Sequence, residues 1–390
     1  MQRIGEQEHK YVKEVLGSQF RASTANDMVN RLESKFAEVF QSKYAIAFTN
    51  GTATMHAALV AAGVGPGDEV IVPPLTMAST SFVVIQAGAL PVFADIDPDS
   101  WTIDPASVRE RITDKTKAII PVSIYGLAPD FDELQKIAEQ YGLFILEDDA
   151  QCFMGYYKGR IVGSIGDAAS FSFQNSKHMT SGQGGMIITD DETLATKTRR
   201  FNSLGYAAVS AGKGKITKDM IQDPAYERHA DIGWNYRMPA LCAAVALGQL
   251  EKLPQIVDCR VKVAQLYAEA VAGCSWLTPQ LVKDDIVHAY WTYSLKLSDK
   301  VDFSWHQFKK KYIEAGGDGF YGAWKLTYLE PVFRNKKIKD YQVQVFDEGL
   351  CPVAESIQPY LIQLKANYLD IDLAAKKAET LAETVKSFGG

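Results

Sequence analysis

The sequence is poor in cysteine and has no long apolar run. Its 390 residues include only five cysteines, at scattered positions: Cys152, Cys242, Cys259, Cys274 and Cys351. No two of them form a C-x-x-C pair, so we expect buried, reduced thiols and a cytosolic protein rather than a disulfide scaffold. No stretch of about 18 apolar residues occurs, which predicts no transmembrane helix. The polar N-terminus also lacks the apolar segment of a secretory signal.

An excess of positive charge is also missing. The chain has 41 Lys and Arg against 47 Asp and Glu, a net charge of −6, which argues against a nucleic-acid binder with a broad basic face. The six histidines are scattered, without an H-E-x-x-H spacing, so no metal site is predicted. With 47% apolar and 23% charged residues, the composition is that of a folded globular protein and excludes a disordered chain.

The glycine-rich motifs of nucleotide-binding proteins are absent as well. No G-x-G-x-x-G follows the first predicted strand and no Walker A lysine occurs, so nicotinamide and nucleoside-triphosphate chemistry lack support. The chain has instead a series of short apolar runs separated by stretches of helical character. The runs lie at 44–48, 69–73, 91–95, 118–122, 143–147, 168–173 and 185–189. Such an alternation of apolar strands with helices predicts an α/β fold with a mostly parallel, seven-stranded sheet.

The pattern changes after about residue 240. Residues 238–272 predict one or two long helices, and strand-like pieces mix with helices beyond residue 286, which suits a smaller α+β domain. Because a chain of this length needs more than one core, three parts are expected. They are an N-terminal segment (1–20), a large cofactor-binding domain (21–255) and a small C-terminal domain (256–390). The stretch 207–223, rich in glycine and lysine, predicts a long loop.

Polar residues come directly after three of the predicted strands. Ligands of an open α/β sheet bind beyond the carboxyl ends of its strands, so these residues are candidate ligand contacts. Asn50–Thr54 opens a helix whose N–H groups suit a phosphate, although a plain helix cap explains this segment equally well. Asp148 can pair with a cationic ring nitrogen or a metal, or can cap the next helix. Lys177 lies in a glycine-rich turn, where it is either a Schiff-base former or a solvated surface lysine.

The three groups together match the needs of pyridoxal 5'-phosphate (PLP). Its aldehyde requires a lysine, its pyridinium nitrogen an acid, and its phosphate a helix N-terminus. The sequence therefore predicts PLP as the cofactor.

Five longer segments carry a resemblance to a known family. They are NGTATMHAAL (50–59), GVGPGDEVIVPPLT (63–76), ILEDDAQ (145–151), GSIGDAASFSFQNSKHMTSGQGG (163–185) and GWNYRMPALCAAVALGQL (233–250). In this order the segments resemble the DegT/StrS family of PLP-dependent sugar aminotransferases, over about residues 20–270 and again at CPVAE (351–355). The resemblance implies the PLP-dependent transferase fold of the aspartate-aminotransferase type, in a homodimer with shared active sites.

The resemblance also implies roles for single residues. Lys177 matches the catalytic lysine that bonds to the cofactor, Asp148 the acid paired with the pyridine nitrogen, and Gln151 a residue near the ring hydroxyl. The implied phosphate contacts are the turn Gly51, Thr52 and Ala53, then Ser172, and Asn235 reaching over from the neighbouring subunit. Arg237, in the same motif as Asn235, is expected in a structural ion pair.

The sequence departs from the family at three places. Met77 stands where the family has an aromatic residue stacked on the cofactor ring, and a thioether can still pack on a ring. Gln183 replaces the glutamate of a G-E-G-G motif, which removes a negative charge near the substrate. The family's small-domain segment with histidine and proline is replaced by residues 316–331. Candidate substrate contacts are His288, Trp291, Trp324 and Lys325, with Lys325 or Arg334 as the cation for an acidic acceptor, and domain packing explains most of them equally well.

The implied reaction is a ping-pong transamination from an amino donor, expected to be glutamate, to a keto or aldehyde sugar of cell-surface polysaccharide or lipopolysaccharide. Lys177 then acts as general base and acid. One candidate product is 8-amino-3,8-dideoxy-octulosonate; nucleotide-linked 4-ketosugars and cyclitol or aminohydroxybenzoate-type acceptors stay open. His178 keeps open the family branch that dehydrates ketosugars with a histidine in place of the lysine, although the spacing from Ser172 to Lys177 favours the lysine. A PLP-fold regulatory or binding protein is the alternative of another class.

Overall fold

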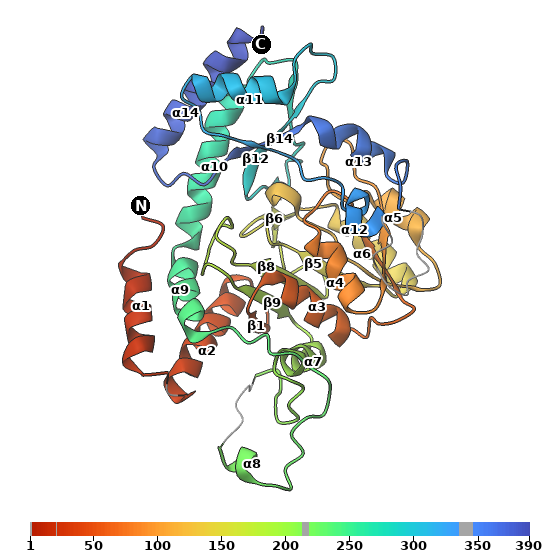
Figure 1. The fold of residues 1–390 in the computed structure, drawn as a ribbon, viewed down its shortest axis with the longest axis vertical. Coiled ribbons are helices and arrows are strands. Elements are labelled where there is room, and N and C mark those ends of the chain that lie inside the picture. Colours follow the sequence, from red (N-terminus) through yellow and green to blue (C-terminus); the bar gives the residue numbers. More distant parts are fainter. Residues whose placement is uncertain (1, 21, 213–217, 335–345) are drawn as a thin grey trace.

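The chain folds around a seven-stranded sheet with helices on both faces (Figure 1). The structure is a computed structural model that describes residues 2–20, 22–212, 218–334 and 346–390. For residues 22–26, 218 and 221 it describes the backbone alone. The strands, in spatial order, are β1 (Tyr44–Phe48), β9 (Gly185–Thr189), β8 (Ala168–Ser172), β5 (Phe144–Asp148), β4 (Thr116–Ile119), β2 (Glu69–Val72) and β3 (Leu90–Phe93).

The prediction of a mostly parallel sheet is confirmed. Only β9 is antiparallel to its neighbours, β1 and β8, and the remaining pairs are parallel. Each strand lies within two or three residues of an apolar run found in the sequence. The runs are apolar throughout because both faces of the sheet are covered.

Alternate residues of the strands enter different cores. In β1, Ile46 and Phe48 belong to one cluster and Ala45 and Ala47 to another, as expected when neighbouring side chains point to opposite faces. The helices packed on the Ile46 face are α3 (Gly51–Ala61), α4 (Ser79–Gln86) and α7 (Glu192–Asn202). Those on the opposite face are α2 (Ala22–Val39), α9 (Ala240–Glu251), α5 (Pro105–Arg111) and α6 (Phe131–Tyr141).

The C-terminal part builds a second, smaller core. Its antiparallel sheet has the order β10 (Leu277–Pro279), β12 (Thr292–Leu297), β14 (Leu361–Lys365) and β13 (Tyr321–Gly322). The helices α10 (Leu253–Ala270), α11 (Trp305–Glu314) and α14 (Ile371–Ser387) pack on it. This agrees with the predicted α+β character of the region.

The predicted boundary at residue 255 falls inside a continuous helix. Val257 of α10 belongs to the core under the large sheet, whereas Val263 and Tyr267 of the same helix belong to the small core. The segment 326–361, with η2 (Thr327–Leu329), α12 (Pro331–Arg334), α13 (Pro352–Ile357) and η3 (Gln358–Tyr360), also packs its described apolar residues against the large sheet. The two parts therefore share a helix and a packed segment.

Two further pieces complete the chain. A three-stranded sheet joins β11 (Ile286–Val287) to β6 (Tyr156–Tyr157) and β7 (Arg160–Ile161), and α1 (Glu6–Gly17) packs on α9. Within the predicted loop 207–223, residues 213–217 lie outside the described residues. The short helix α8 (Lys218–Gln222) follows and lies away from the main body at the bottom of Figure 1.

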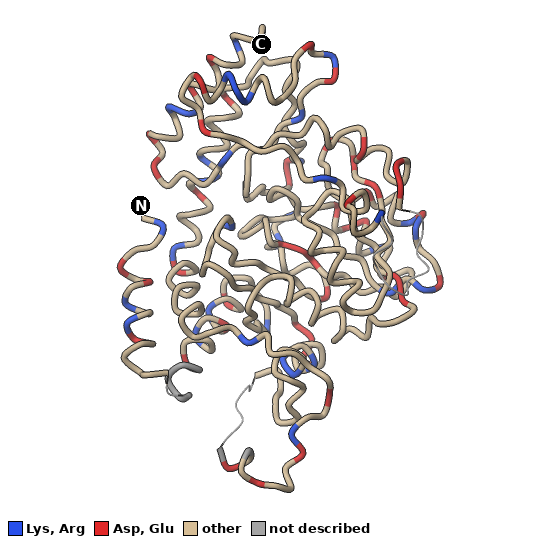
Figure 2. Tube along the Cα trace, viewed as in Figure 1, with Lys and Arg blue, Asp and Glu red and all other residues tan. Residues whose placement is uncertain are grey.

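The distribution of charge and the burial of the cysteines can be compared with the sequence analysis. Acidic and basic residues are mixed along the trace (Figure 2). All five cysteines are free, but Cys242 and Cys259 are partly exposed rather than buried. Among the described helices, none has the length and apolar character needed to cross a membrane. The described His, Cys, Asp and Glu side chains form no group of three suited to a metal ion.

Candidate active site

The edge of the sheet at which ligands were expected brings together the ends of β1, β8 and β5. Phe48 and Ser172, the last residues of β1 and β8, both pair with Gly185 at the start of β9. The last residue of β5, Asp148, pairs with Ser170 of the parallel strand β8. The segments that carry the predicted phosphate turn, the acid and the lysine therefore begin at one edge.

The N-terminus of α3 offers free N–H groups there. The Asn50 side chain caps the helix by accepting the N–H of Ala53 at 2.8 Å. The N–H groups of Gly51 and Thr52 donate to no acceptor within the described part of the chain. Of the three residues predicted for the phosphate turn, Gly51 and Thr52 thus have donors available, whereas the Ala53 N–H is already used by the cap. Free N–H groups at a helix N-terminus attract an anion.

The turn at the start of α3 packs closely against the end of β8 and the start of β9. A Cβ at Gly51 would lie 2.9 Å from the Ser172 Cβ, and one at Gly185 would lie 2.6 Å from the backbone of Asn50. The Ser172 hydroxyl oxygen accepts the N–H of Gln174 at 3.4 Å, and no described residue takes its proton. Glycine is therefore required at both positions, because any side chain would push the strand ends apart.

Lys177 lies in the turn after β8 and is partly buried. Its Nζ is 4.4 Å from the centre of the Trp291 ring. Burial, the largest influence, lowers the pKa of Lys177 to about 8, while the charge of Asp148 raises it and that of Arg260 lowers it. A lysine with this pKa is unprotonated to a substantial extent near neutral pH, as nucleophilic attack and proton removal require.

His178, the alternative to the lysine, points into the core. Its ring is almost fully buried and lies 5.6 Å from that of Phe153, and its Nε2 is 2.8 Å from the carbonyl oxygen of Ala289. Burial lowers the pKa of His178 well below its usual value, so the ring is neutral. This geometry supports the lysine as the reacting residue.

Asp148 is buried and held by neighbouring donors. Its carboxylate accepts the Thr80 hydroxyl at 2.8 Å and the Ala150 N–H at 3.3 Å. The Thr80 hydroxyl lies 3.3 Å from that of Thr76, so a short chain of hydroxyls leads to the acid. Burial raises the pKa of Asp148, whereas the hydrogen bond from Thr80 and the charge of Lys177 lower it. The donors therefore favour the charged form, which a protonated ring nitrogen needs as partner.

The acids on either side of Asp148 face the other side of the sheet, because neighbouring strand residues alternate. Glu147 accepts three backbone N–H groups of the 163–166 turn at 2.6–2.9 Å. Asp149 accepts the Ser123 hydroxyl at 2.6 Å. Burial raises the pKa of both, and the Glu147 charge raises that of Asp149 further. Of these three successive acids, only Asp148 lies on the face of the sheet that carries α3 and Thr80 of α4.

Gln151 is buried with its amide orientation set by the backbone. Its Oε1 accepts the N–H of Tyr125 at 2.7 Å, in η1 (Ile124–Gly126). Tyr125 has a φ of +60°, an uncommon conformation for a residue with a side chain. The Gln151 amide nitrogen donates to no described residue, and so it is available for a ring hydroxyl.

Several predicted contacts are exposed in the single chain. Met77 is 54% exposed, and Gln183 and Asn235 are exposed as well. Arg237 is exposed and its backbone pairs with Phe48. The expected ion pair of Arg237 is not found: no described acid lies within ion-pair distance. Exposure frees these side chains for a ligand or a second subunit.

Of the predicted substrate residues, Trp291 contacts the lysine amine directly, and Trp324 packs against Trp291. The Trp324 ring is 5.8 Å from that of Trp291, the ring beneath the Lys177 amine. Lys325, its neighbour, is exposed and its side chain has no polar partner among the described residues. Trp291 thus presents its ring to the Lys177 amine, and Trp324 extends that aromatic surface.

His288 and Arg334 are occupied elsewhere. His288 is 5% exposed, its Nε2 lies 3.1 Å from Gln280 Oε1, and its Nδ1 accepts the Tyr290 N–H at 2.8 Å. Arg334 forms an ion pair with Asp347 at 3.0 Å on the surface. The structure therefore does not support a substrate contact for His288, because both ring nitrogens are engaged within the chain.

Sequence reasoning missed two residues next to the site. Thr80 holds the acid from the first turn of α4, and a search of the residues that directly follow a strand does not reach it. Arg260 contacts the lysine turn from α10, and its signal was its place among Ile256, Val263 and Tyr267 on one buried helix face.

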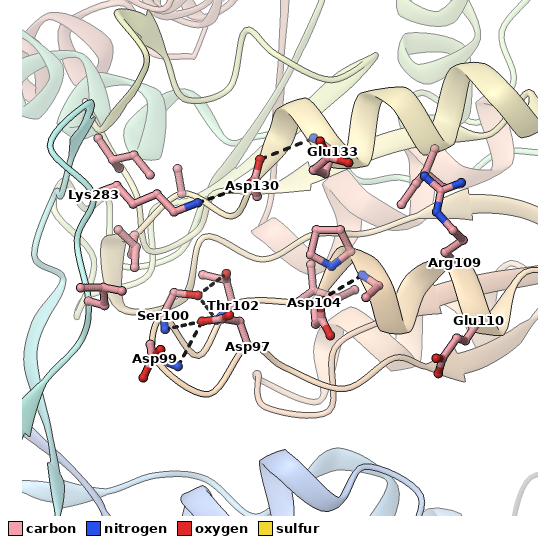
Figure 3. Close-up of a pocket in the computed structure, with 18 residues that line it drawn as sticks. Asp97, Asp99, Ser100, Thr102, Asp104, Arg109, Glu110, Asp130, Glu133 and Lys283 are labelled. Atoms are coloured by element: carbon pink, nitrogen blue, oxygen red, sulfur yellow. Dashed lines mark hydrogen bonds and ion pairs between the residues drawn. The ribbon is translucent and has the colours of Figure 1, made fainter.

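A cavity of about 690 Å³ lies apart from these residues (Figure 3). The 97–106 loop, the start of α6 and the segment 281–286 line it, and none of the predicted site residues does. Two of its acids are engaged within the chain: Asp97 accepts the N–H of Ser100 at 2.7 Å, and Asp130 pairs with Lys283 at 3.1 Å. The chemistry of the strand ends, rather than the size of this cavity, locates the active site.

The arrangement at the strand ends fits PLP. Two free N–H groups and a serine hydroxyl suit its phosphate, a held carboxylate its ring nitrogen, and a lysine of lowered pKa its aldehyde. The fold and this site define a PLP-dependent aminotransferase. A model of the DegT/DnrJ/EryC1/StrS aminotransferase family matches residues 2–368, and the chain belongs to this family.

Relatives support this assignment along the chain. The chain is 35% identical over 288 residues to GDP-perosamine synthase of Escherichia coli O157:H7, covering 74% of each protein. It is 38% identical over 297 residues to the spore coat polysaccharide biosynthesis protein SpsC of Bacillus subtilis, covering 76% of this chain and 75% of that protein. The crystal structure of an aminotransferase from Psychrobacter cryohalolentis superposes with a TM-score of 0.89 at 30% identity, over 99% of this chain and 98% of that one.

Proposed function

We propose that this aminotransferase moves an amino group from glutamate to the keto carbon of a nucleotide-linked sugar that is used in cell-surface polysaccharide. The observation that carries the amino transfer is the placement of Lys177, Asp148 and the α3 N-terminus at one sheet edge. The names of the two relatives above, one a GDP-linked amino sugar synthase and one a polysaccharide biosynthesis protein, support the sugar acceptor. The five free cysteines support a reducing compartment, and we propose the cytoplasm.

The protein residues would share the work around the cofactor. When bound, PLP supplies an aldehyde and a ring that accepts electrons. The N–H groups of Gly51 and Thr52 and the Ser172 hydroxyl would hold its phosphate. Asp148 would hold the proton on the ring nitrogen, with Thr80 keeping the carboxylate oriented. Gln151 would donate to the ring hydroxyl, and Met77 would cover the ring face.

Lys177 would carry the proton transfers. As general base its Nζ removes the proton from the α-carbon of the amino donor. As general acid and base in the second half of the reaction, it returns a proton to the acceptor carbon that receives the nitrogen. A pKa near 8 suits both directions, because neither protonation state is rare near neutral pH.

A homodimer would complete the site. Asn235 is exposed in the single chain, close to the exposed Trp234 and Ile232. We propose that this stretch contacts a second subunit, with Asn235 reaching the phosphate held by that subunit. An apolar patch next to a polar ligand contact is typical of a subunit interface.

The segment 316–331 bears on the identity of the acceptor. This segment replaces the family's histidine- and proline-containing piece, and Trp324 lies there beside Trp291. This departure favours testing an acceptor without a nucleotide, an octulosonate that would give 8-amino-3,8-dideoxy-octulosonate in lipopolysaccharide synthesis. The Lys325 ammonium group would then pair with the carboxylate of the octulosonate. Cyclitol ketones and aminohydroxybenzoate-type acceptors belong in the same screen.

The experiment has two steps. Glutamate added to the PLP-loaded protein should bleach the cofactor absorbance, which a cofactor-binding regulatory protein would not show. The loaded protein is then screened against nucleotide-linked 4-ketosugars, an 8-oxo-octulosonate and cyclitol ketones, with aminated products identified by mass spectrometry. Lys177→Ala should abolish both signals. Turnover that survives in Lys177→Ala would contradict the role of the lysine. Turnover with cyclitol ketones alone would contradict the proposal that the acceptor is a sugar.

A further inference from the structure

Arg260 of α10 is a buried arginine that has no acidic partner among the described residues. It is 2% exposed, and no described carboxylate lies within ion-pair distance of its guanidinium. Within the part of the chain that the structure describes, the group donates only to backbone carbonyls: to Trp291 at 2.6 Å, to Lys177 at 3.2 Å and to Ser176 at 3.5 Å. A buried charge that is met only by carbonyl dipoles costs stability. Its contacts with Ser176 and Lys177 join this buried charge to the turn that carries the lysine.

Trp291 belongs to the same arrangement. Its carbonyl oxygen accepts from Arg260, and its indole Nε1 donates to the Ser176 carbonyl at 2.9 Å. Its ring lies under the Lys177 amine, 4.4 Å from Nζ. Arg260 thus bonds both to the turn and to the residue on which the lysine side chain rests, and so it fixes one relative to the other.

A second arginine reaches the turn from the N-terminal segment. Arg3 donates to the carbonyl oxygens of Asn175 at 2.5 Å and Lys177 at 2.9 Å. The Arg3 carbonyl oxygen in turn accepts from the side chains of Gln249 at 2.5 Å and Lys252 at 2.7 Å, at the end of α9. The Lys177 carbonyl therefore receives two guanidinium groups, one of them fully buried.

We propose that Arg260 is a positioning residue for the catalytic lysine: it ties the Ser176 and Lys177 carbonyls to that of Trp291 and thereby sets where the amine lies. It also keeps a second positive charge near that amine. Burial lowers the pKa of Arg260 only to about 9, so the group stays charged at neutral pH. Its charge then opposes that of Asp148 in setting the pKa of Lys177. The inference concerns the aminotransferase chemistry and is independent of the sugar acceptor.

The test uses the full-length protein freed of cofactor and two substitutions. Arg260→Gln removes the charge, and Arg260→Lys keeps the charge but cannot span the carbonyls. The reactivity of Lys177 toward a trace of acetylating reagent, read by mass spectrometry over a pH series, gives its apparent pKa. Hydrogen exchange of the 174–178 peptide reports how firmly the turn is held.

For Arg260→Gln we expect the apparent pKa of Lys177 to rise by about one unit, since a like charge is lost. Exchange in 174–178 should become about tenfold faster. For Arg260→Lys the pKa should stay near that of the wild type, while the exchange still increases.

The matched control is Arg199→Lys. Arg199 is also largely buried and donates to Glu33 at 2.8 Å and to the Ala45 carbonyl at 3.1 Å, remote from the lysine turn. It should leave both readouts at Lys177 unchanged. Wild-type exchange and a wild-type pKa in Arg260→Gln would overturn the proposal. If that variant does not fold, wild-type exchange in Arg260→Lys overturns it, and faster exchange confined to the turn supports it.

Discussion

The hydrogen bond from Thr80 to Asp148 gives a sharp prediction about cofactor binding. Thr80→Val keeps the shape of the side chain and removes the hydroxyl that donates to the carboxylate at 2.8 Å. A hydrogen bond to a charged group contributes about 1.5–3 kcal/mol. At about 1.4 kcal/mol per pKa unit, its loss raises the pKa of Asp148 by about one to two units.

The sign of the effect follows from the direction of this shift. Burial already raises the pKa of Asp148, and the Thr80 bond lowers it, so the variant holds a protonated acid up to a higher pH. A protonated acid cannot pair with a protonated ring nitrogen. The Kd for PLP should therefore increase about ten- to hundredfold below the new pKa, and the difference from the wild type should narrow as the pH rises.

The assay is a titration of the cofactor-free protein with PLP at several pH values between roughly 6 and 9, followed by absorbance. Thr76→Val is the matched control, because the Thr76 hydroxyl lies 3.3 Å from Thr80 and does not contact the carboxylate. It should have a much smaller effect. Equal PLP affinity of Thr80→Val and wild type at every pH would refute the reasoning about the acid.

Three other substitutions test separate parts of the site. Gly51→Ala brings a Cβ to 2.9 Å from that of Ser172 and should weaken binding of PLP, and of inorganic phosphate, by at least about tenfold; unchanged phosphate affinity would show that the turn is not the anion site. Asp149 has a raised pKa in the folded state, so its contribution to stability is lost as the pH rises through that pKa. Asp149→Asn should therefore be more stable than wild type to urea by about 1 kcal/mol at alkaline pH and not at acid pH, and a variant less stable at both would contradict the assignment. Trp324→Ala should lower kcat/KM for the sugar acceptor about tenfold, as expected for loss of an aromatic contact, while the rate of the glutamate half-reaction, measured by stopped flow, stays near wild type; a loss confined to the glutamate step would place Trp324 elsewhere.

Features set by local pattern could be predicted from the sequence. The strands were predictable because a strand covered on both faces is apolar throughout, as 44–48 and 185–189 show. The position of Asp148 and Lys177 at one edge of the sheet was predictable because both lie at or just after strand ends. The resemblance to the family added the fold and an expected role for each of these residues.

Features set by tertiary packing were not predictable in this way. Arg237 forms no ion pair with the described residues of the single chain, and both ring nitrogens of His288 are engaged within the chain, because both outcomes depend on which elements pack against these residues. Arg260 resembles a surface arginine until its helix is seen to bury that face. The domain boundary was placed inside α10 because no composition change marks a helix that two cores share.

The contact of Arg3 with the lysine turn has a practical consequence for anyone who prepares this protein. Its side chain donates to the Lys177 carbonyl, so the N-terminal segment contacts the turn that carries Lys177. We expect an affinity tag fused ahead of Arg3 to displace its side chain from the Lys177 turn. A tag at the other end would follow α14, which packs on the small core. Cofactor content measured on protein tagged at the N-terminus should therefore be compared with that of protein tagged at the C-terminus.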